Sequence, residues 1–547
     1  MLNFFKHFMK NDKKEFHIQK PEPAPTLSKD LNIHASLDEN KKFLSELLHY
    51  PLSNDVQFRD INICINDKFY KGLLISYDGL VNNDIINNYI LRELMNENNR
   101  FNTSDSKSIL KNKSIPNLKD IICNSILTDC QVSAVSTFEK VVENILHGDS
   151  ALFIDGETYS LICDTKNIPG RSVTKSEIEM NLKGPAEGFI ENFRTNTALI
   201  RKFVKDENLI FESVEVGTET TTRCAIAYIS TIANDSIVDE VRRRINGVEV
   251  DYLLDSGELE QLIEDKTFII DPLILSTERP DKVASHLIEG RVAIIVEGSN
   301  NVLIVPAIFS DFTHASEDSY LRFPYAEMLR IFRLPAIFLS IFLPGLYISI
   351  CNFHQEMIPT DLLFAIAGAR EKVPFTMLTE LLIMEIAFEI IREASIRTPA
   401  PMGATIGIVG TLILGQAIVS ANIVSPILVI IVALTGISTF VTTNYALNYS
   451  FRILRFFYIL LGATAGFFGL AIGIFIHLCL LTSTTSFGVP YLTPFAPTRK
   501  GIFKDDLFIF PIWKKENRPP FLKTKKPVRE PHISRKWDTS EKGGNKN

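Results

Sequence analysis

The chain has 547 residues and a formal net charge of −7, and 46% of its residues are hydrophobic. This length is enough for two or three domains, and the charge is divided unevenly: residues 1–328 carry −16, residues 329–482 carry +1 and residues 483–547 carry +8. The acidic first part argues against nucleic-acid binding, and seven scattered cysteines without a CxxC spacing argue against a zinc site and favour a reducing compartment.

The first part is predicted to be cytoplasmic and to have an α/β fold. It begins without the apolar run of a signal peptide. We interpret residues 1–40 as a flexible polar arm and residues 41–183 and 184–328 as two α/β subdomains. Residues 70–94 have the pattern of a strand, a turn and an amphipathic helix, and "ALFIDGETYSLIC" predicts a hairpin with Asp155-Gly156 as its two-residue turn.

The two predicted subdomains share a sequence pattern. "HGDSALFIDGETYSLI" (147–162) and "EGRVAIIVEGSNNVLI" (289–304) both place glycine, two residues, alanine, three apolar residues, an acid and glycine before an apolar run. "LVNNDII" (80–86) and "IANDSIV" (232–238) match in the same order. Either two common hairpins are alike by chance, or the region is duplicated, in which case Gly148–Gly156 corresponds to Gly290–Gly298 and the copies meet near Gly184.

The apolar middle, residues 329–482, predicts an α-helical multi-pass membrane domain. Uncharged or nearly uncharged segments of bilayer-spanning length predict four spans, at 334–353, 402–423, 426–447 and 456–481. Four spans place both ends of this domain on one side, so that the basic tail, residues 483–547, is cytoplasmic in agreement with the positive-inside tendency. The same topology places Arg452 and Arg455 in a loop on the other side, which does not agree with that tendency.

A segment at 375–394 is apolar but contains four glutamates and an arginine. Each central charge costs about 2.5–3.5 kcal/mol on the membrane-insertion scale, so the segment should not span alone in lipid. At 100° per residue, Glu385, Glu389 and Glu393 lie within about 80° of one another, with Arg392 among them and Glu380 well off that face. We therefore expect an amphipathic helix that lies at the membrane interface or turns these three glutamates towards water.

The segment 402–423 has two faces of different character. Gly403, Gly407 and Gly410 form a stripe of small residues, which lets helices pack closely in lipid. Roughly opposite is a face that is polar at both ends and apolar in its centre, made of Thr405, Val409, Leu412, Gln416 and Ser420. This face suits a pore that closes at an apolar constriction, or polar residues that bond across a helix interface.

No enzyme signature such as a P-loop, HExxH or GxSxG is present. His354 and Glu356 alone do not make a metal site, so we expect neither a metal nor another cofactor, and no enzymatic activity. "DSGELEQ" predicts the start of a helix with Ser256 near its N-cap. The run Arg242–Arg244 is interpreted as a solvated face or a subunit contact.

Several long segments resemble the GerA-type A subunits of spore germinant receptors, over about residues 70 to 497. They are "GPAEGFIENFRTNTALIRKFVKDENL" (184–209), "DSGELEQLIED" (255–265), "TERPDKVASHLIEGRVAIIVEGSNNVLIVP" (277–306), "FHQEMIPTDLLFAIAGAREKVPF" (353–375), "REASIRTPAPMGATIGIVG" (392–410) and "SFGVPYLTPFAP" (486–497). The N-terminal arm and the C-terminal tail fall outside this resemblance.

The resemblance implies a multi-pass protein of the spore inner membrane with its soluble region on the cytoplasmic side. It also implies partners: other copies of the same chain, a transporter-like B subunit and a C lipoprotein. The expected function is an oligomeric ion channel that opens in response to nutrient and triggers germination. A solute transporter and a non-conducting scaffold for the B subunit are the alternatives.

Overall fold

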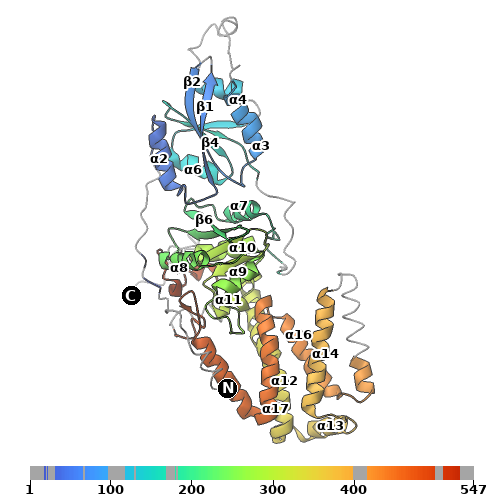
Figure 1. The fold of residues 1–547 in the computed structure, drawn as a ribbon. Coiled ribbons are helices and arrows are strands. Elements are labelled where there is room, and N and C mark those ends of the chain that lie inside the picture. Colours follow the sequence, from blue (N-terminus) through green and yellow to red (C-terminus); the bar gives the residue numbers. More distant parts are fainter. Residues whose placement is uncertain are drawn as a thin grey trace.

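The computed structural model describes residues 18–19, 21, 31–65, 68–96, 118–127, 131–167, 179, 183–397, 415–498, 509 and 511–529. Two α/β subdomains follow one another along the chain, and a helical part extends from the second of them (Figure 1). The predicted combination of an α/β region and a helical region is confirmed.

The first subdomain is a five-stranded antiparallel sheet covered by helices. The strand order is β1-β2-β4-β5-β3. Its elements are α2 (Leu37–Leu47), β1 (Val56–Ile65), β2 (Lys68–Tyr77), α3 (Asn83–Ile85), η1 (Ile86–Leu91), α4 (Arg92–Leu94), α5 (Leu118–Ile121), η3 (Ile122–Ile126), β3 (Val132–Val135), α6 (Phe138–Leu146), β4 (Ser150–Ile154) and β5 (Ser160–Cys163). The strand, turn and helix predicted over residues 70–94 are confirmed.

The second subdomain repeats this topology. Its strand order is β6-β7-β9-β10-β8. This is the order of the first sheet if β6 to β10 correspond, in chain order, to β1 to β5. Its elements are α7 (Phe193–Phe203), β6 (Leu209–Val216), β7 (Thr222–Ile229), α8 (Asp235–Asn246), α9 (Ser256–Ile263), β8 (Leu275–Thr277), α10 (Pro280–Glu289), β9 (Val292–Val296), β10 (Val302–Val305) and α11 (Phe309–Thr313). The duplication predicted from the sequence is therefore confirmed at the level of topology.

Glycines at equivalent places explain why the two sequence patterns match. Gly148 precedes β4 with φ +95° and Gly290 precedes β9 with φ +98°, a conformation that residues with a side chain rarely adopt. A Cβ on Gly148 would also lie 2.9 Å from the Leu80 carbonyl oxygen. The predicted turn at Asp155-Gly156 is present, since the Glu157 N–H donates to the Ile154 carbonyl at 3.2 Å, although strand pairing already ends at Phe153 and Ser160.

A buried ion pair joins the two subdomains. Arg201 on α7 places its Nε 2.6 Å from the Asp55 carboxylate, and both side chains are almost completely buried. The Arg201 guanidinium also lies over the Tyr77 ring, 4.1 Å from its centroid. Since the backbone N–H of Asn54 donates to the Phe211 carbonyl at 3.0 Å, the first subdomain is also tied to strand β6.

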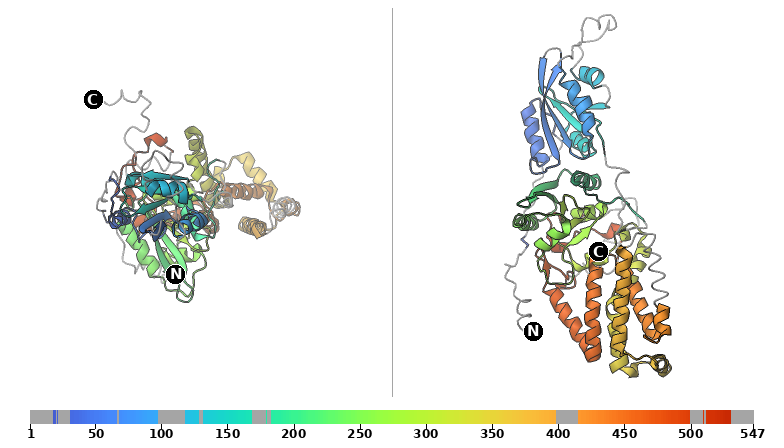
Figure 2. Two further views of the ribbon diagram at one scale, coloured as in Figure 1. Left: turned by 90° about the horizontal axis from the view of Figure 1, so that it is seen from above. Right: turned by 45° about the vertical axis from the view of Figure 1, so that its right-hand side comes forward.

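The helical part contains helices that run to and from the second subdomain (Figure 2). They are α12 (Phe323–Phe353), α13 (Thr360–Arg370), α14 (Met377–Arg397), α16 (Pro426–Phe440) and α17 (Tyr445–Thr482), and residues 415–420 are also helical. Among the described residues, α12 and α17 are long and apolar enough to cross a membrane, and α16 is apolar but shorter. The predicted span 334–353 lies within α12, whereas 426–447 is interrupted between Phe440 and Tyr445.

The predicted span 456–481 is not a single span, because α17 is a helical hairpin. Gly466 has φ 59° and ψ −141°, which breaks the helix there. The hydroxyl of Tyr458 lies 3.2 Å from Nδ1 of His477. In a straight helix these residues would be about 28 Å apart along the axis, so the chain must reverse between them. Figure 1 shows the two arms of α17 diverging from this reversal.

The second arm of α17 brings the chain back to the second subdomain. Nε2 of His477 lies 3.0 Å from Oδ2 of Asp271, and Lys266 donates to the Ser483 carbonyl at 2.9 Å. Both ends of the helical part therefore lie against the second subdomain, whereas the four predicted spans do not correspond to four single helices. The prediction of a loop around Arg452 and Arg455 is wrong, because both residues belong to the first arm of α17.

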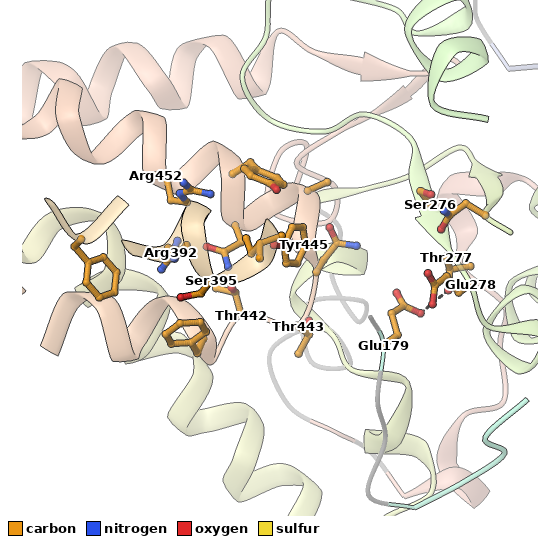
Figure 3. Close-up of a pocket in the computed structure, with 18 of the residues that line it drawn as sticks. Glu179, Ser276, Thr277, Glu278, Arg392, Ser395, Thr442, Thr443, Tyr445 and Arg452 are labelled. Carbon is orange, nitrogen blue, oxygen red and sulfur yellow. Dashed lines mark hydrogen bonds between the residues drawn. The ribbon is translucent and has the colours of Figure 1, made fainter. Parts of the chain in front are cut away.

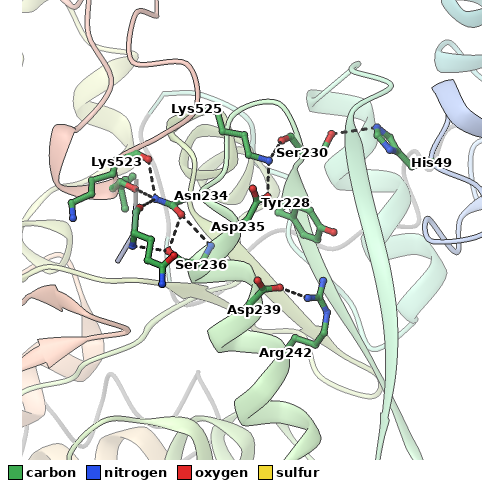
Figure 4. Close-up of polar contacts among 12 residues, drawn as sticks. His49, Tyr228, Ser230, Asn234, Asp235, Ser236, Asp239, Arg242, Lys523 and Lys525 are labelled. Carbon is green, nitrogen blue, oxygen red and sulfur yellow. Dashed lines mark hydrogen bonds and ion pairs between the residues drawn. The ribbon is translucent and has the colours of Figure 1, made fainter. Parts of the chain in front are cut away.

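The basic tail also returns to the second subdomain, through residues 511–529, which we call the docked tail. Phe521 and Leu522 are buried in the core of the second subdomain. The side-chain amide of Asn234 lies 2.9 Å from the Gln19 carbonyl oxygen, 3.4 Å from that of Leu522 and 2.9 Å from that of Lys523. Figure 4 shows Lys523 and Lys525 at the N-terminal end of α8, where Lys525 pairs with Asp235 at 2.6 Å.

Replacement of Asn234 by alanine should release the docked tail. The change removes the N-cap of α8, worth about 1 kcal/mol, together with the amide that contacts both ends of the chain. We expect faster hydrogen exchange at the Lys525 amide, which donates to the Ile232 carbonyl, and faster proteolysis of residues 511–529. Asn192→Ala is the matched control, since Asn192 caps α7 without touching the tail. Equal exchange at Lys525 in both variants would show that Asn234 does not hold the tail.

Candidate functional site

The glutamate-rich helix is α14, and its side chains meet cations from other helices. At the end of α14 that is farther from the α/β subdomains, Glu380 is fully buried and pairs with Arg370 of α13 at 3.0 Å. The second carboxylate oxygen of Glu380 accepts from the backbone N–H of Ser425 at 3.1 Å. Glu380 therefore joins α13 and α14 to the start of α16.

Glu385 forms the most deeply buried ion pair of the helical part. Its carboxylate lies 2.9 Å from Nη1 of Arg455 on α17, and the two side chains are 0% and 1% exposed. Arg455 also donates to the Ser340 carbonyl of α12 at 2.9 Å and to the Thr439 hydroxyl of α16 at 2.8 Å. One guanidinium thus connects four helices.

Closer to the second subdomain, Glu389 meets two arginines. It forms an ion pair with Arg452 of α17, and Nη1 of Arg392 lies 3.8 Å from its other oxygen. The Arg392 guanidinium carbon lies 5.2 Å from the ring centroids of both Phe388 and Phe440. The last glutamate, Glu393, pairs with Arg397 at 2.7 Å near the surface.

The prediction that the three glutamates face water is wrong for Glu385, and the exposure of the other two increases towards the end of the helix. The exposed fraction of the side chain is 0% at Glu385, 17% at Glu389 and 51% at Glu393. The expectation failed because it assumed that a polar helix face needs water. Two arginines that are close neighbours on α17 supply the counter-charge instead.

The predicted pore-lining face is described only in part. Thr405, Val409 and Leu412, as well as Gly403, Gly407 and Gly410, lie outside the described residues. Gln416 and Ser420 are exposed and helical, and the Ser420 hydroxyl donates to the Gln416 carbonyl at 2.8 Å. The role of this face in a pore stays a prediction.

Sequence reasoning missed the residues that complete the charge cluster, which we define as Glu385, Glu389, Arg392, Arg452 and Arg455. Arg452 and Arg455 were the signal that could have found it, since they are the only charged residues between Arg397 and the end of α17. Charged residues inside apolar segments need partners, and the nearest unmatched acids in the sequence are those of α14.

A cavity of about 700 Å³ lies where the charge cluster meets the second subdomain. Figure 3 shows Arg392 and Arg452 at one end of this cavity and Thr277 and Glu278 at the other. The lining therefore comes from α14, α16 and α17 on one side and from the edge of the second sheet on the other. Its size is in the range of small-molecule sites, which are about 300–1,000 Å³.

The other sequence candidates have structural partners. Arg242 pairs with Glu212 at 2.5 Å, Arg243 with Glu240 at 2.7 Å, and Arg244 with Asp265 at 2.8 Å. Helix α9 begins as predicted, with Asp255 as its N-cap. His354 packs against the ring of Phe467, with centroids 4.5 Å apart.

Comparison with known proteins gives consistent matches along most of the chain. Residues 42–521 match the family described as Bacillus/Clostridium GerA spore germination protein. Spore germination protein KA of Bacillus subtilis is 41% identical over 481 residues, which cover 87% of this chain and 85% of that protein. The membrane protein YfkQ of Bacillus subtilis is 35% identical over 496 residues, which cover 90% of this chain and 92% of that protein.

A solved structure is also similar. The crystal structure of the N-terminal domain of the A subunit of the Bacillus megaterium spore germinant receptor GerK3 is 32% identical in sequence. It matches with a TM-score of 0.39, over 52% of this chain and 99% of that domain.

Removal of the Glu385 charge should destabilise the helical part strongly. In Glu385→Gln, Arg455 stays buried without its counter-charge, which typically costs about 3–5 kcal/mol. We expect a lower thermal unfolding midpoint in detergent and a lower abundance in the membrane. Glu393→Gln is the matched control, because its half-exposed pair should contribute no more than about 1 kcal/mol. If both variants unfold at the same temperature, the buried pair does not hold the helices together.

Proposed function

The chain belongs to the GerA family of spore germination proteins as an A-type subunit of the germinant receptors, and from this premise we propose that it forms an oligomeric ion channel in the spore inner membrane. In this proposal the channel opens when the receptor detects a nutrient, and ion release triggers germination. Its partners are other copies of the chain, a transporter-like B subunit and a C lipoprotein.

The observation that carries the membrane part of the proposal is the apolar surface of the helices. Large apolar side chains are exposed on the helices of this part; examples are Phe364 at 70%, Ile437 at 64%, Phe468 at 71% and Phe475 at 68%. Apolar surface of this extent needs lipid or protein around it. The cytoplasmic placement of the α/β region is supported by the basic tail, which lies on the same side of the helices.

The channel part of the proposal rests on the predicted span at 402–423, of which residues 415–420 are described as helical. Its polar–apolar–polar face suits a pore that closes by expelling water from a short apolar constriction. The exposed side chains of Gln416 and Ser420 are compatible with such a face in an assembly. The ion-paired glutamates of α14 are less suited to this role, because their charges are largely neutralised within the chain.

Ion flux through the reconstituted receptor tests the proposal. We expect potassium-loaded liposomes that contain the A, B and C proteins to release potassium when nutrient is added, without a gradient of any second solute. A requirement for a gradient of a second, co-transported solute would favour a transporter. Nutrient binding without any flux would favour a scaffold for the B subunit.

Two changes at Val409 test the position of the constriction. Val409→Ala should widen it and cause ion leakage without nutrient, whereas Val409→Phe should block nutrient-triggered release. Ile418→Val is the control, since at 100° per residue Ile418 would lie about 180° from Val409, on the opposite side of the predicted helix. Protein abundance is measured beside flux in each variant. Normal gating at normal abundance in both Val409 variants would remove this residue from the pore.

A further inference from the structure

The charge cluster carries one positive charge more than its carboxylates neutralise. Arg392, Arg452 and Arg455 are 10%, 17% and 1% exposed, and they face the carboxylates of Glu385 and Glu389. Arg397 does not change this balance, because it pairs with Glu393. A buried charge without a counter-charge is costly, so among the described residues this excess favours a further anion, while the carboxylates of Glu179 and Glu278 lie at the other end of the adjoining cavity.

The atoms that lack a partner indicate where that anion binds. Among the described residues, Nε and Nη2 of Arg392 have no hydrogen-bond partner and are screened from solvent, and the same holds for Nε of Arg452. In a guanidinium, Nε–H and Nη2–H point in parallel from one edge, and this edge binds both oxygens of a carboxylate or phosphate. The rings of Phe388 and Phe440 lie close to the Arg392 guanidinium and hold it in place.

The cavity described above is lined by both arginines, and because Nε and Nη2 of Arg392 are screened from solvent, an anion in it reaches them by a small rotation of the Arg392 side chain. Both Arg392 and Arg452 line it, together with the side chains of Asn448 and Tyr449. Within the described part of the chain, the amide oxygen Oδ1 of Asn448 also lacks a hydrogen-bond partner, and as an acceptor it would take an N–H or O–H group of the ligand rather than its anionic group. The side chain of Ile391 adds apolar surface. A ligand of this cavity would thus combine an anionic group with a small organic body.

We propose that this cavity is a binding site for a carboxylate- or phosphate-bearing anion, whose charged group is held by the free edge of Arg392 and by Arg452. The anion comes either from a free metabolite or from the headgroup of an anionic phospholipid. Because the cavity is lined by both the second subdomain and helices α14, α16 and α17, its occupant contacts the α/β region and the helical part together. The proposal does not require that the protein conduct ions.

Anion binding to the full-length chain in detergent tests this proposal. We expect inorganic phosphate to raise the thermal unfolding midpoint above that in chloride of equal ionic strength. Arg392→Gln should weaken phosphate binding about tenfold to a hundredfold, since it removes a bidentate charge-assisted contact. Arg397→Gln is the matched control, because this arginine is 78% exposed and lies further along the same helix, close to its end.

A second arm separates the two sources of the anion. Vesicles of phosphatidylglycerol and of phosphatidylcholine are compared with the wild-type chain and with Arg392→Gln. Stabilisation by phosphatidylglycerol that depends on Arg392, and that inorganic phosphate does not reproduce, assigns the site to a lipid. Stabilisation by phosphate in both kinds of vesicle assigns it to a free anion.

A chemical measurement on the wild-type chain keeps the test independent of whether the variant folds. Phenylglyoxal modifies arginine side chains, and we expect phosphate or phosphatidylglycerol to protect Arg392 but not Arg397 from it. The proposal is overturned if neither anion protects Arg392. It is also overturned if Arg392→Gln lowers the oligomer mass while leaving anion binding unchanged, since an acid of a neighbouring copy would then neutralise the cluster.

Discussion

The helical part is organised by the need to neutralise charges that it buries. Arg455 cannot remain in an apolar bundle alone, and Glu385 meets this need from a helix 70 residues away in the chain. The remaining donors of Arg455 fix α12 through the Ser340 carbonyl and α16 through the Thr439 hydroxyl. The relative positions of four helices thus depend on one guanidinium, in a bundle whose apolar surfaces alone would allow many packings.

The α/β and helical parts share one hydrophobic core. The core of the second subdomain extends without interruption to Phe451, Leu454 and Tyr458 on the first arm of α17. The second arm returns to the same subdomain through His477 and Asp271. A movement of α17 would therefore disturb the second subdomain directly, whereas the first subdomain contacts the second through a separate set of groups around Arg201 and Asp55.

The two duplicated subdomains have similar folds but are packed against different segments of the chain. The second sheet has the helices, the docked tail and Ile18 packed around it, and all of them contribute to the two cores on its faces. The first sheet has its own cores, formed almost entirely by residues of its own subdomain. Equivalent glycines preserve the fold in both copies, and the surface residues around them have diverged to make these contacts.

The sequence by itself determined the α/β folds, their duplication and the family. These features depend on local patterns, such as the glycines at 148 and 290 that the backbone needs for positive φ. It also indicated the apolar segments, but not how they are arranged. Only the tertiary structure decided that α17 reverses at Gly466, since Gly462, Gly469 and Gly473 look equally permissive in the sequence.

Likewise, the periodicity of α14 placed its glutamates on one face correctly but could not say what that face would meet. The counter-charge of Glu385 comes from a residue distant in the chain, and the docked tail binds a helix almost 290 residues before it. Periodicity shows which residues share a face of one helix, but it carries no information on what that face contacts. The partner that neutralises a buried charge is chosen by the packing of the whole chain.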